Sequence, residues 1–146
     1  MKIPYHAAVT VPRETTVAEA VEVMRREGVG SLLVTEHGRL VGIVTDRDIA
    51  LRVIGRRIPY DGRIDAVMTC DVITVPPTAG RDEVIELFRK NAIRRLPVVD
   101  GDRLVGVITL DDLLAIGAAR DLPGLAEAVA EKIRHPRREA GTPAVG

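Results

Sequence analysis

The chain has 146 residues, 46% of them hydrophobic and 29% charged, a balance typical of a globular protein rather than a disordered one. Its 21 basic and 21 acidic residues cancel, and aromatic residues make up only 2%, which argues against nucleic acid as a partner. A single cysteine, Cys70, excludes a disulfide framework within the chain, and we find neither a signal peptide nor an apolar run long enough to span a bilayer. We therefore expect a cytoplasmic protein with no membrane partner.

The first half of the chain begins with a strand and a helix. The β-rich residues 8–11 end at Pro12, which cannot continue a hydrogen-bonded ladder. The segment Thr16-Val17-Ala18-Glu19 has the form of a helix capping box, and apolar residues follow it at helical spacing. Gly28 is typical of a helix end, so the pattern predicts a helix between Thr16 and Gly28.

A hairpin and a second helix follow. Residues 31–36 and 40–45 are nearly all apolar and are joined by His37-Gly38, a pattern that predicts two strands covered on both faces. A second helix is expected to begin at Thr45. The predicted order of the first half is therefore β-α-β-β-α.

The same order recurs in the second half of the chain, after a segment rich in glycine, proline and charged residues. The predicted elements are a strand at 72–75, a helix around 84–88, strands at 96–100 and 104–109, and a helix from Thr109.

The two halves are copies of one unit. The segment Val41-Gly42-Ile43-Val44-Thr45-Asp46-Arg47-Asp48 matches Val105-Gly106-Val107-Ile108-Thr109-Leu110-Asp111-Asp112 at an offset of 64 residues. The offset holds without gaps from about residue 9 to residue 54. Such a register indicates a duplication whose copies have since diverged.

The predicted fold class is α/β (α+β), with two β-α-β-β-α repeats packed as a pseudo-twofold pair. We place repeat one at residues 1–58, a linker at 59–69, repeat two at 70–120, and a C-terminal helix with a flexible tail at 121–146. The polar, Pro/Gly-rich composition of the last residues is the reason for expecting flexibility, or contact with a partner, at that end.

These motifs resemble a known family. The paired β-α-β-β-α order, the segment that begins at Val41 and its copy, and the lead-in from Val67 to Val75 resemble tandem CBS domains (cystathionine-β-synthase domains, a pair often called a Bateman module). The resemblance covers roughly residues 9–119. The lead-in Lys2-Ile3-Pro4-Tyr5-His6 departs from it, because it contains no Met-Thr pair like Met68-Thr69, so the first strand is expected to begin differently.

The resemblance implies a regulatory module rather than an enzyme. Such pairs commonly bind adenosine-containing ligands, namely AMP, ADP, ATP or S-adenosylmethionine, and require no cofactor. They often dimerise into a disc of four repeats and usually regulate an attached enzyme or channel. We therefore expect an adenine-nucleotide sensor that forms a homodimer and signals to an unidentified partner protein.

The candidate ligand residues form two Thr-x-x-Asp motifs at the transitions from strand to helix. Thr45 and Thr109 offer hydroxyls to a ribose or phosphate, and Asp48 and Asp112 lie one turn further on, where an acceptor suits the hydroxyls of a ribose. The first N–H groups of a helix lack internal partners and favour an anion such as phosphate. Asp111 adds a further acceptor in repeat two.

A structural interpretation of the same motifs competes with this one. A threonine three residues before an acid is also a helix cap, worth about 0.5–2 kcal/mol. Taken alone, each motif is more typical of a cap than of a ligand site, and the family resemblance is what favours ligand binding. One threonine can serve both purposes.

Arg94-Arg95, directly before the strand at 96–100, is the candidate phosphate site. Arginine suits phosphate through its bidentate donors, and members of the resembling family often carry basic residues here. A solvated pair of charges is the alternative. Repeat one has Gly30-Ser31 at this place, so we expect one better phosphate site and one weaker or vacant site.

Three further residues are candidates with less support. Ile43 and Val107 follow Gly42 and Gly106 and can flank an adenine, although most such residues belong to a core. A glycine within a strand permits close approach, either of a base edge or of tightly packed chain. Arg47 can reach a phosphate across a dimer interface, and a solvent-exposed arginine is an equal alternative.

No catalytic constellation supports an enzyme. The sequence has no nucleophile elbow, no Walker loop and no metal-ligand spacing among its three histidines, so we expect no catalytic residues and no metal. A structural pairing module that scaffolds another protein and binds no small molecule is the second hypothesis, favoured by the missing basic pair in repeat one.

Overall fold

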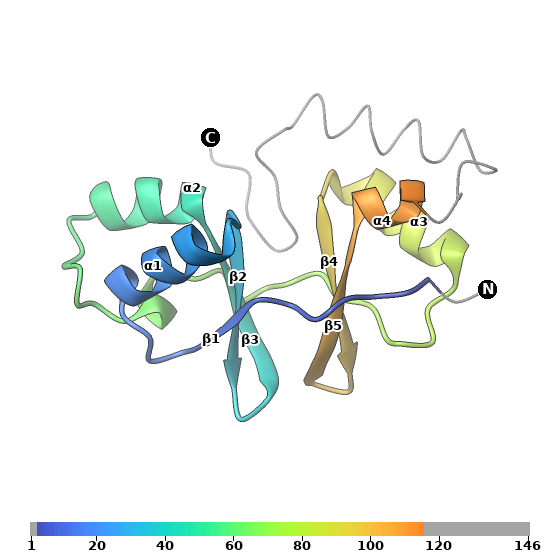
Figure 1. The fold of residues 1–146 in the computed structure, drawn as a ribbon, viewed down its shortest axis with the longest axis horizontal. Coiled ribbons are helices and arrows are strands. Elements are labelled where there is room, and N and C mark those ends of the chain that lie inside the picture. The colour runs from blue at the N-terminus through green and yellow to red at the C-terminus, as the bar shows by residue number, and fades with distance from the viewer. Residues whose placement is uncertain (1–2, 116–146) are drawn as a thin grey trace.

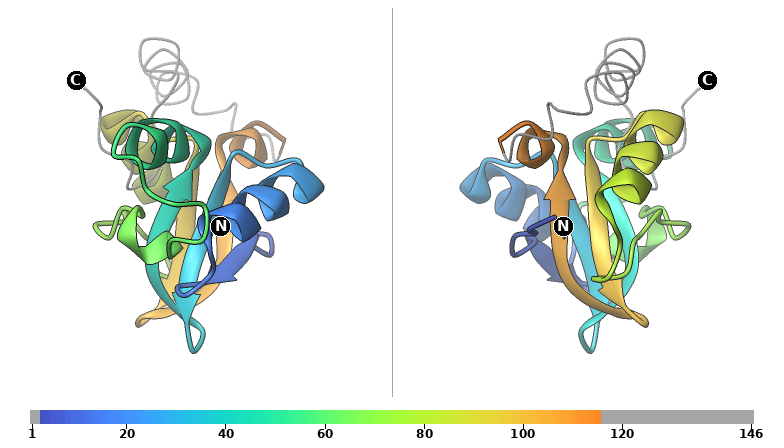
Figure 2. Two further views of the ribbon diagram at one scale, coloured as in Figure 1. Left: turned by 90° about the vertical axis from the view of Figure 1, so that its left-hand side faces the viewer. Right: turned by 90° about the vertical axis from the view of Figure 1, so that its right-hand side faces the viewer.

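The structure, a computed structural model, describes residues 3–115 and contains two units whose strands join in one mixed sheet (Figure 1). The sheet has five strands in the order β1-β2-β3-β5-β4. Each unit is built on a hairpin, and both hairpin turns project at the end of the molecule away from the helices (Figures 1 and 2). This confirms the predicted fold of two repeats of mixed α/β structure. The helix and tail expected at 121–146 lie outside the described residues.

The first unit follows the predicted order. Its elements are β1 (Thr10–Pro12), α1 (Val17–Glu27), β2 (Ser31–Glu36), β3 (Arg39–Thr45), α2 (Asp46–Asp48) and the π-helix η1 (Ile49–Ile54). The capping box at Thr16 and Glu19 is formed as expected, and Gly28 ends α1 in the left-handed conformation, with φ at 65°. His37 and Gly38 both have positive φ, which suits the tight turn between β2 and β3.

A short 3₁₀ helix, η2 (Ile64–Ala66), precedes the second unit in the chain. The elements of this unit are α3 (Arg81–Asn91), β4 (Arg95–Asp100), β5 (Arg103–Thr109) and α4 (Leu110–Ala115). The predicted hairpin is confirmed, with antiparallel pairs running from Arg95 and Thr109 to Asp100 and Arg103.

The strand predicted at 72–75 is wrong except at its last residue. Only Val75 makes a bridge, to Val98 of β4. In the first unit, Leu33 donates its N–H to the carbonyl of Val9 at 3.1 Å and so extends the pairing of β1. The residue at the same place in β4 is Pro97, which has no N–H to donate. The ladder therefore shrinks to a single bridge.

Each unit has its own apolar core. The first core joins α1, the β2–β3 hairpin and η1, and the second joins α3, α4 and the β4–β5 hairpin. Four consecutive residues are buried in each of β2 and β4, as expected for strands covered on both faces. The largest fully buried side chain is Phe88, on α3.

The two hairpins meet edge to edge near their turns. Arg39 of β3 pairs with Arg103 of β5. Leu40 donates its N–H to the carbonyl of Asp102, and Leu104 donates to the carbonyl of Gly38, both at 3.0 Å. This short ladder makes one sheet of two hairpins.

The units also exchange the segments that lead into them. His6 pairs with Val107 of the second unit, with backbone hydrogen bonds of 3.0 and 2.9 Å. Thr69 pairs in the same way with Ile43 of the first unit, at 2.9 and 2.8 Å. The lead-in with Tyr5 and His6 thus has the place that Met68 and Thr69 have in the other repeat, although its sequence differs.

Gly42 and Gly106 make this exchange possible. A Cβ atom at Gly42 would lie 2.5 Å from the Met68 sulfur and 3.0 Å from the Thr69 carbonyl oxygen. At Gly106 it would overlap the Tyr5 ring and lie 2.7 Å from the His6 carbonyl oxygen. These two glycines therefore permit the close approach of another segment of the same chain, residues 68–69 at Gly42 and residues 5–6 at Gly106.

Gly106→Ala should destabilise the protein by about 1–3 kcal/mol, because the added methyl group meets the His6 backbone, which cannot move without breaking its pairing with Val107. Urea unfolding measures the effect. Gly80→Ser is the control, since a Cβ there meets nothing within 4 Å, and it should be neutral or slightly stabilising. Equal stability of Gly106→Ala and the parent protein would contradict the packing.

Candidate functional site

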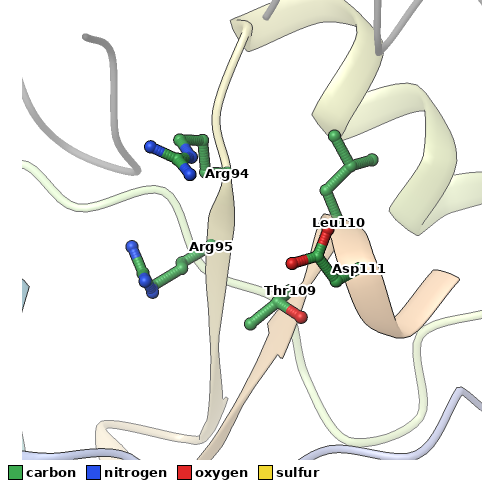
Figure 3. A pocket seen from close by; sticks show the side chains of 5 residues that line it. All are labelled: Arg94, Arg95, Thr109, Leu110 and Asp111. Carbon is green, nitrogen blue, oxygen red and sulfur yellow. The ribbon is translucent and has the colours of Figure 1, made fainter. Parts of the chain in front are cut away.

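A small open pocket lies where β4 begins and β5 ends, at the end of the hairpin opposite its turn (Figure 3). Its empty volume, open solvent included, is about 260 Å³. The residues that line it are Arg94, Arg95, Thr109, Leu110 and Asp111. Four of these five are among the predicted site residues.

The backbone fixes the geometry of this pocket. Leu110 donates its N–H to the carbonyl of Arg94 at 3.0 Å, which ties the start of α4 to the residue before β4. The side chains of Arg94 and Arg95 extend to the same side of β4, and the Asp111 carboxylate lies on the α4 side of the gap (Figure 3). The residues that line the pocket thus include two arginines and one aspartate, a set that suits a ligand with both anionic and hydroxyl groups.

Thr109 and Asp112 form a capping box at the start of α4. The Thr109 N–H donates to the Asp112 carboxylate at 2.8 Å, and the Asp112 N–H donates to the Thr109 hydroxyl at 3.1 Å. The other carboxylate oxygen of Asp112 lies 2.5 Å from Nε2 of His6. Asp112 thus has both oxygens engaged, and the carboxylate that lines the pocket is that of Asp111.

The environment of Asp112 lowers the pKa of its carboxyl group. Burial alone would raise this pKa, but the Thr109 N–H, the His6 ring and the Thr109 hydroxyl together outweigh that effect. The Asp112 carboxylate therefore stays charged to a lower pH than an unperturbed aspartate.

Thr45 and Asp48 form the same box in the first unit and are more deeply buried, with exposed fractions of 2% and 1%. Both reciprocal hydrogen bonds are 3.0 Å long. The second oxygen of Asp48 lies 3.7 Å from the Arg52 guanidinium. The cap and the Arg52 guanidinium thus account for the contacts of both side chains.

The remaining candidates lie away from the pocket. Ile43 is buried where β3 pairs with Thr69, and Val107 is half-buried where β5 pairs with His6. Arg47 is half-buried at the start of the first unit's second helix, and its N–H donates to the Asp46 carboxylate at 2.8 Å. That Ile43, Val107 and Arg47 contact a ligand stays a prediction.

Two residues of this region were not singled out from the sequence as contacts. Leu110 lines the pocket but is an ordinary core residue in the sequence pattern. His6 contacts Asp112, a residue 106 positions away. One feature of the sequence could have suggested that contact. Tyr5-His6 precedes the first repeat as Met68-Thr69 precedes the second.

Within residues 3–115, no three His, Cys, Asp or Glu side chains are grouped so that they could hold a metal ion. None of the helices in the same range is long and apolar enough to cross a membrane.

A profile of the CBS domain matches residues 2–55 and again residues 64–118, which together make up most of the chain. The chain belongs to the CBS domain family. It carries a tandem pair of CBS domains, a regulatory module, and the resemblance noted in the sequence is confirmed. The boundaries placed at 58, 69 and 120 stay a prediction.

Known proteins with this pair differ in what surrounds it. The CBS domain-containing protein YhcV of Bacillus subtilis is 36% identical over 104 residues, which are 71% of this chain and 74% of that protein. An inosine-5'-monophosphate dehydrogenase of Methanocaldococcus jannaschii is 37% identical over 122 residues, 80% of this chain but 24% of the enzyme. The crystal structure of TA0289, a CBS domain protein of Thermoplasma acidophilum, has a TM-score of 0.72 at 28% identity and covers 96% of this chain and 79% of its own.

Thr45→Ala should lower the free energy of unfolding by about 0.5–2 kcal/mol, because it removes the acceptor for the Asp48 N–H inside a buried cap. Thr45→Ser keeps the hydroxyl and should retain most of that stability. Urea unfolding of both variants measures the difference. Unchanged stability of Thr45→Ala would contradict a capping role. That Thr45 and Asp48 also contact a ligand stays a prediction.

Proposed function

We propose that this CBS pair is a regulatory sensor that binds an adenine nucleotide or a related adenosine compound, with the phosphate groups at Arg94 and Arg95. The observation that supports this most directly is the open pocket that brings both arginines together with Thr109 and Asp111. The expected ligands are AMP, ADP, ATP or S-adenosylmethionine, and we expect the protein to need no cofactor.

The polar residues of the pocket suit the two ends of a nucleotide. Guanidinium groups bind phosphate oxygens through paired donors, and a charge-assisted hydrogen bond contributes about 1.5–3 kcal/mol. Asp111, exposed on the first turn of α4, is the acceptor for ribose hydroxyls in this proposal. Asp112 serves the cap and contacts His6, so it comes second to Asp111 as a ribose acceptor.

Isothermal titration of ligand-free protein tests the proposal. At least one of AMP, ADP, ATP and S-adenosylmethionine should bind, and Arg95→Ser, which places the residue of repeat one in repeat two, should weaken a phosphate-bearing ligand about 10- to 100-fold. Arg56→Ser, at an exposed arginine of the first unit, is the control and should bind like the parent protein. No heat and no thermal stabilisation with any of the four compounds would refute the sensor.

We further propose that the module acts on another protein and is not itself a catalyst. In the related dehydrogenase, the matched segment is about a quarter of the enzyme, so a CBS pair can belong to an enzyme chain without being the whole of it. A ligand that prefers one arrangement of the two repeats shifts the population toward it, and a partner protein reads that arrangement. The cytoplasmic location and the identity of the partner stay predictions.

A homodimer is part of this proposal, and it also serves the second hypothesis of a scaffold without a small ligand. Val21 on α1 and Leu51 and Ile54 on η1 are large apolar side chains with exposed fractions of 42%, 44% and 71%. Burying the exposed part of these side chains against a second copy is favourable, by less than the roughly 1.5–3 kcal/mol of a fully exposed side chain, because Val21 and Leu51 are already more than half covered. These three residues are the contacts that we assign to the dimer.

Ile54→Glu should shift the protein from dimer to monomer, because it would place a carboxylate in that apolar contact. Sedimentation equilibrium over a concentration series measures the change, and circular dichroism confirms that the variant is folded. A parent protein that is monomeric throughout the series, or a variant that dimerises as well as the parent, would contradict this interface.

A further inference from the structure

The residues that line the pocket of repeat two have counterparts of different charge in repeat one. At the offset of 64 residues, Thr109 corresponds to Thr45, and both are threonine. The other four pocket residues all change: Arg94 corresponds to Gly30, Arg95 to Ser31, Leu110 to Asp46, and Asp111 to Arg47. Repeat one therefore loses both cations at the start of the strand. Its carboxylate stands one residue earlier, at the first position of the helix, and Arg47 takes the place of Asp111.

The backbone shows that these positions correspond in space as well as in sequence. Asp46 donates its N–H to the carbonyl of Gly30 at 2.9 Å, as Leu110 donates to Arg94 at 3.0 Å. A Cβ atom built on Gly30 would lie 3.1 Å from a carboxylate oxygen of Asp46. The Asp46 carboxylate thus lies next to the Cβ position of Gly30. In repeat two, the equivalent Cβ position belongs to Arg94.

This carboxylate has no core-forming role that would explain it. Leu110 is buried in the second core, whereas Asp46 is exposed. Its side chain accepts a hydrogen bond from the Arg47 N–H, which holds the charge over the start of the helix and beside Gly30. An anion at this place would meet a negative charge at close range, without the two arginines that line the pocket of repeat two.

We propose that the two repeats have opposite selectivity for charge, and that Asp46 is the residue that excludes phosphate from repeat one. Phosphate binds at Arg94 and Arg95 only, and the matching place in repeat one, with Asp46 beside Arg47, accepts an uncharged group. The inference takes its pocket from the proposed function, but it concerns the anion alone and does not depend on adenine. It predicts one anion site per chain.

Pyrophosphate is the probe, because it carries the charge of a nucleotide without the base. In amide-resolved NMR titrations of the full chain, pyrophosphate should shift the resonances of residues 94–95 and 109–111 and leave those of 30–31 and 45–47 in place. Calorimetry should give one site per chain. Shifts at the repeat-one residues, or none at the repeat-two residues, would overturn the proposal.

The double variant Gly30→Arg, Asp46→Leu rebuilds the repeat-two pair in repeat one and should create a second site, with a dissociation constant within about tenfold of the first. Asp46→Asn changes only the charge and should give pyrophosphate-induced shifts at residues 30–31 that are smaller than those of the double variant. It tests the role of Asp46 if the double variant does not fold. Asp61→Asn is the control, an exposed carboxylate near the start of α1 that should leave one site. Failure of both Asp46 variants to bind in repeat one would overturn the role of Asp46.

The outcome is separable from that of the proposed function. One pyrophosphate site without any binding of adenine compounds would refute the sensor and support the selectivity. Binding of ADP, together with pyrophosphate shifts in both repeats, would support the sensor and refute the selectivity.

Discussion

The arrangement of the two repeats depends on a reciprocal exchange of backbone. His6 pairs with Val107, Thr69 pairs with Ile43, and each pair makes two backbone hydrogen bonds between 2.8 and 3.0 Å. Each crossing residue follows a side chain, Tyr5 or Met68, that lies over a glycine of the other repeat. Because a Cβ at either glycine would collide with the crossing chain, the exchange fixes where one repeat sits against the other. The ladder between Arg39 and Arg103 adds a second connection near the hairpin turns.

This exchange also connects the N-terminal segment with the pocket region. The backbone of His6 is held by β5, and its ring lies against Asp112, whose other oxygen caps α4. The cap residue Thr109 lines the pocket together with Arg94 and Arg95. A displacement of the start of α4 would therefore move the N-terminal segment that crosses between the repeats. The contacts that join them are the His6–Asp112 contact and the Thr109–Asp112 capping box. That is a continuous chain of contacts from the lining of the pocket to the segment that joins the two units.

Much of the fold could be predicted from the sequence, because its signals are local. The capping box at Thr16, the left-handed Gly28 and the His37-Gly38 turn each depend on neighbouring residues, and all three are present in the structure. The strand at 72–75 failed because its pairing depends on the N–H of a residue on another strand, and Pro97 lacks it. The contact of His6 with Asp112 joins residues 106 positions apart and carries no local signal.

The site itself was predicted in part, and the reason lies in what each residue does for folding. Thr45 and Asp48 match Thr109 and Asp112 because both helices begin at the end of a strand and need a cap there, a demand that any copy of the unit must meet. A motif that survives in both copies for that reason carries little information about ligands. The residues with more information are those that this shared requirement does not determine, at the starts of β2 and β4 and at the first positions of the following helices.

At these positions the copies differ in charge at each residue pair, while the backbone hydrogen bond from Asp46 to Gly30 matches that from Leu110 to Arg94 within 0.1 Å. The duplicated unit thus supplies one backbone frame twice, and the side chains placed on it decide what each copy can bind. Folding therefore constrains the residues that the two repeats share, and in the proposed function the residues in which they differ give each repeat its own binding preference.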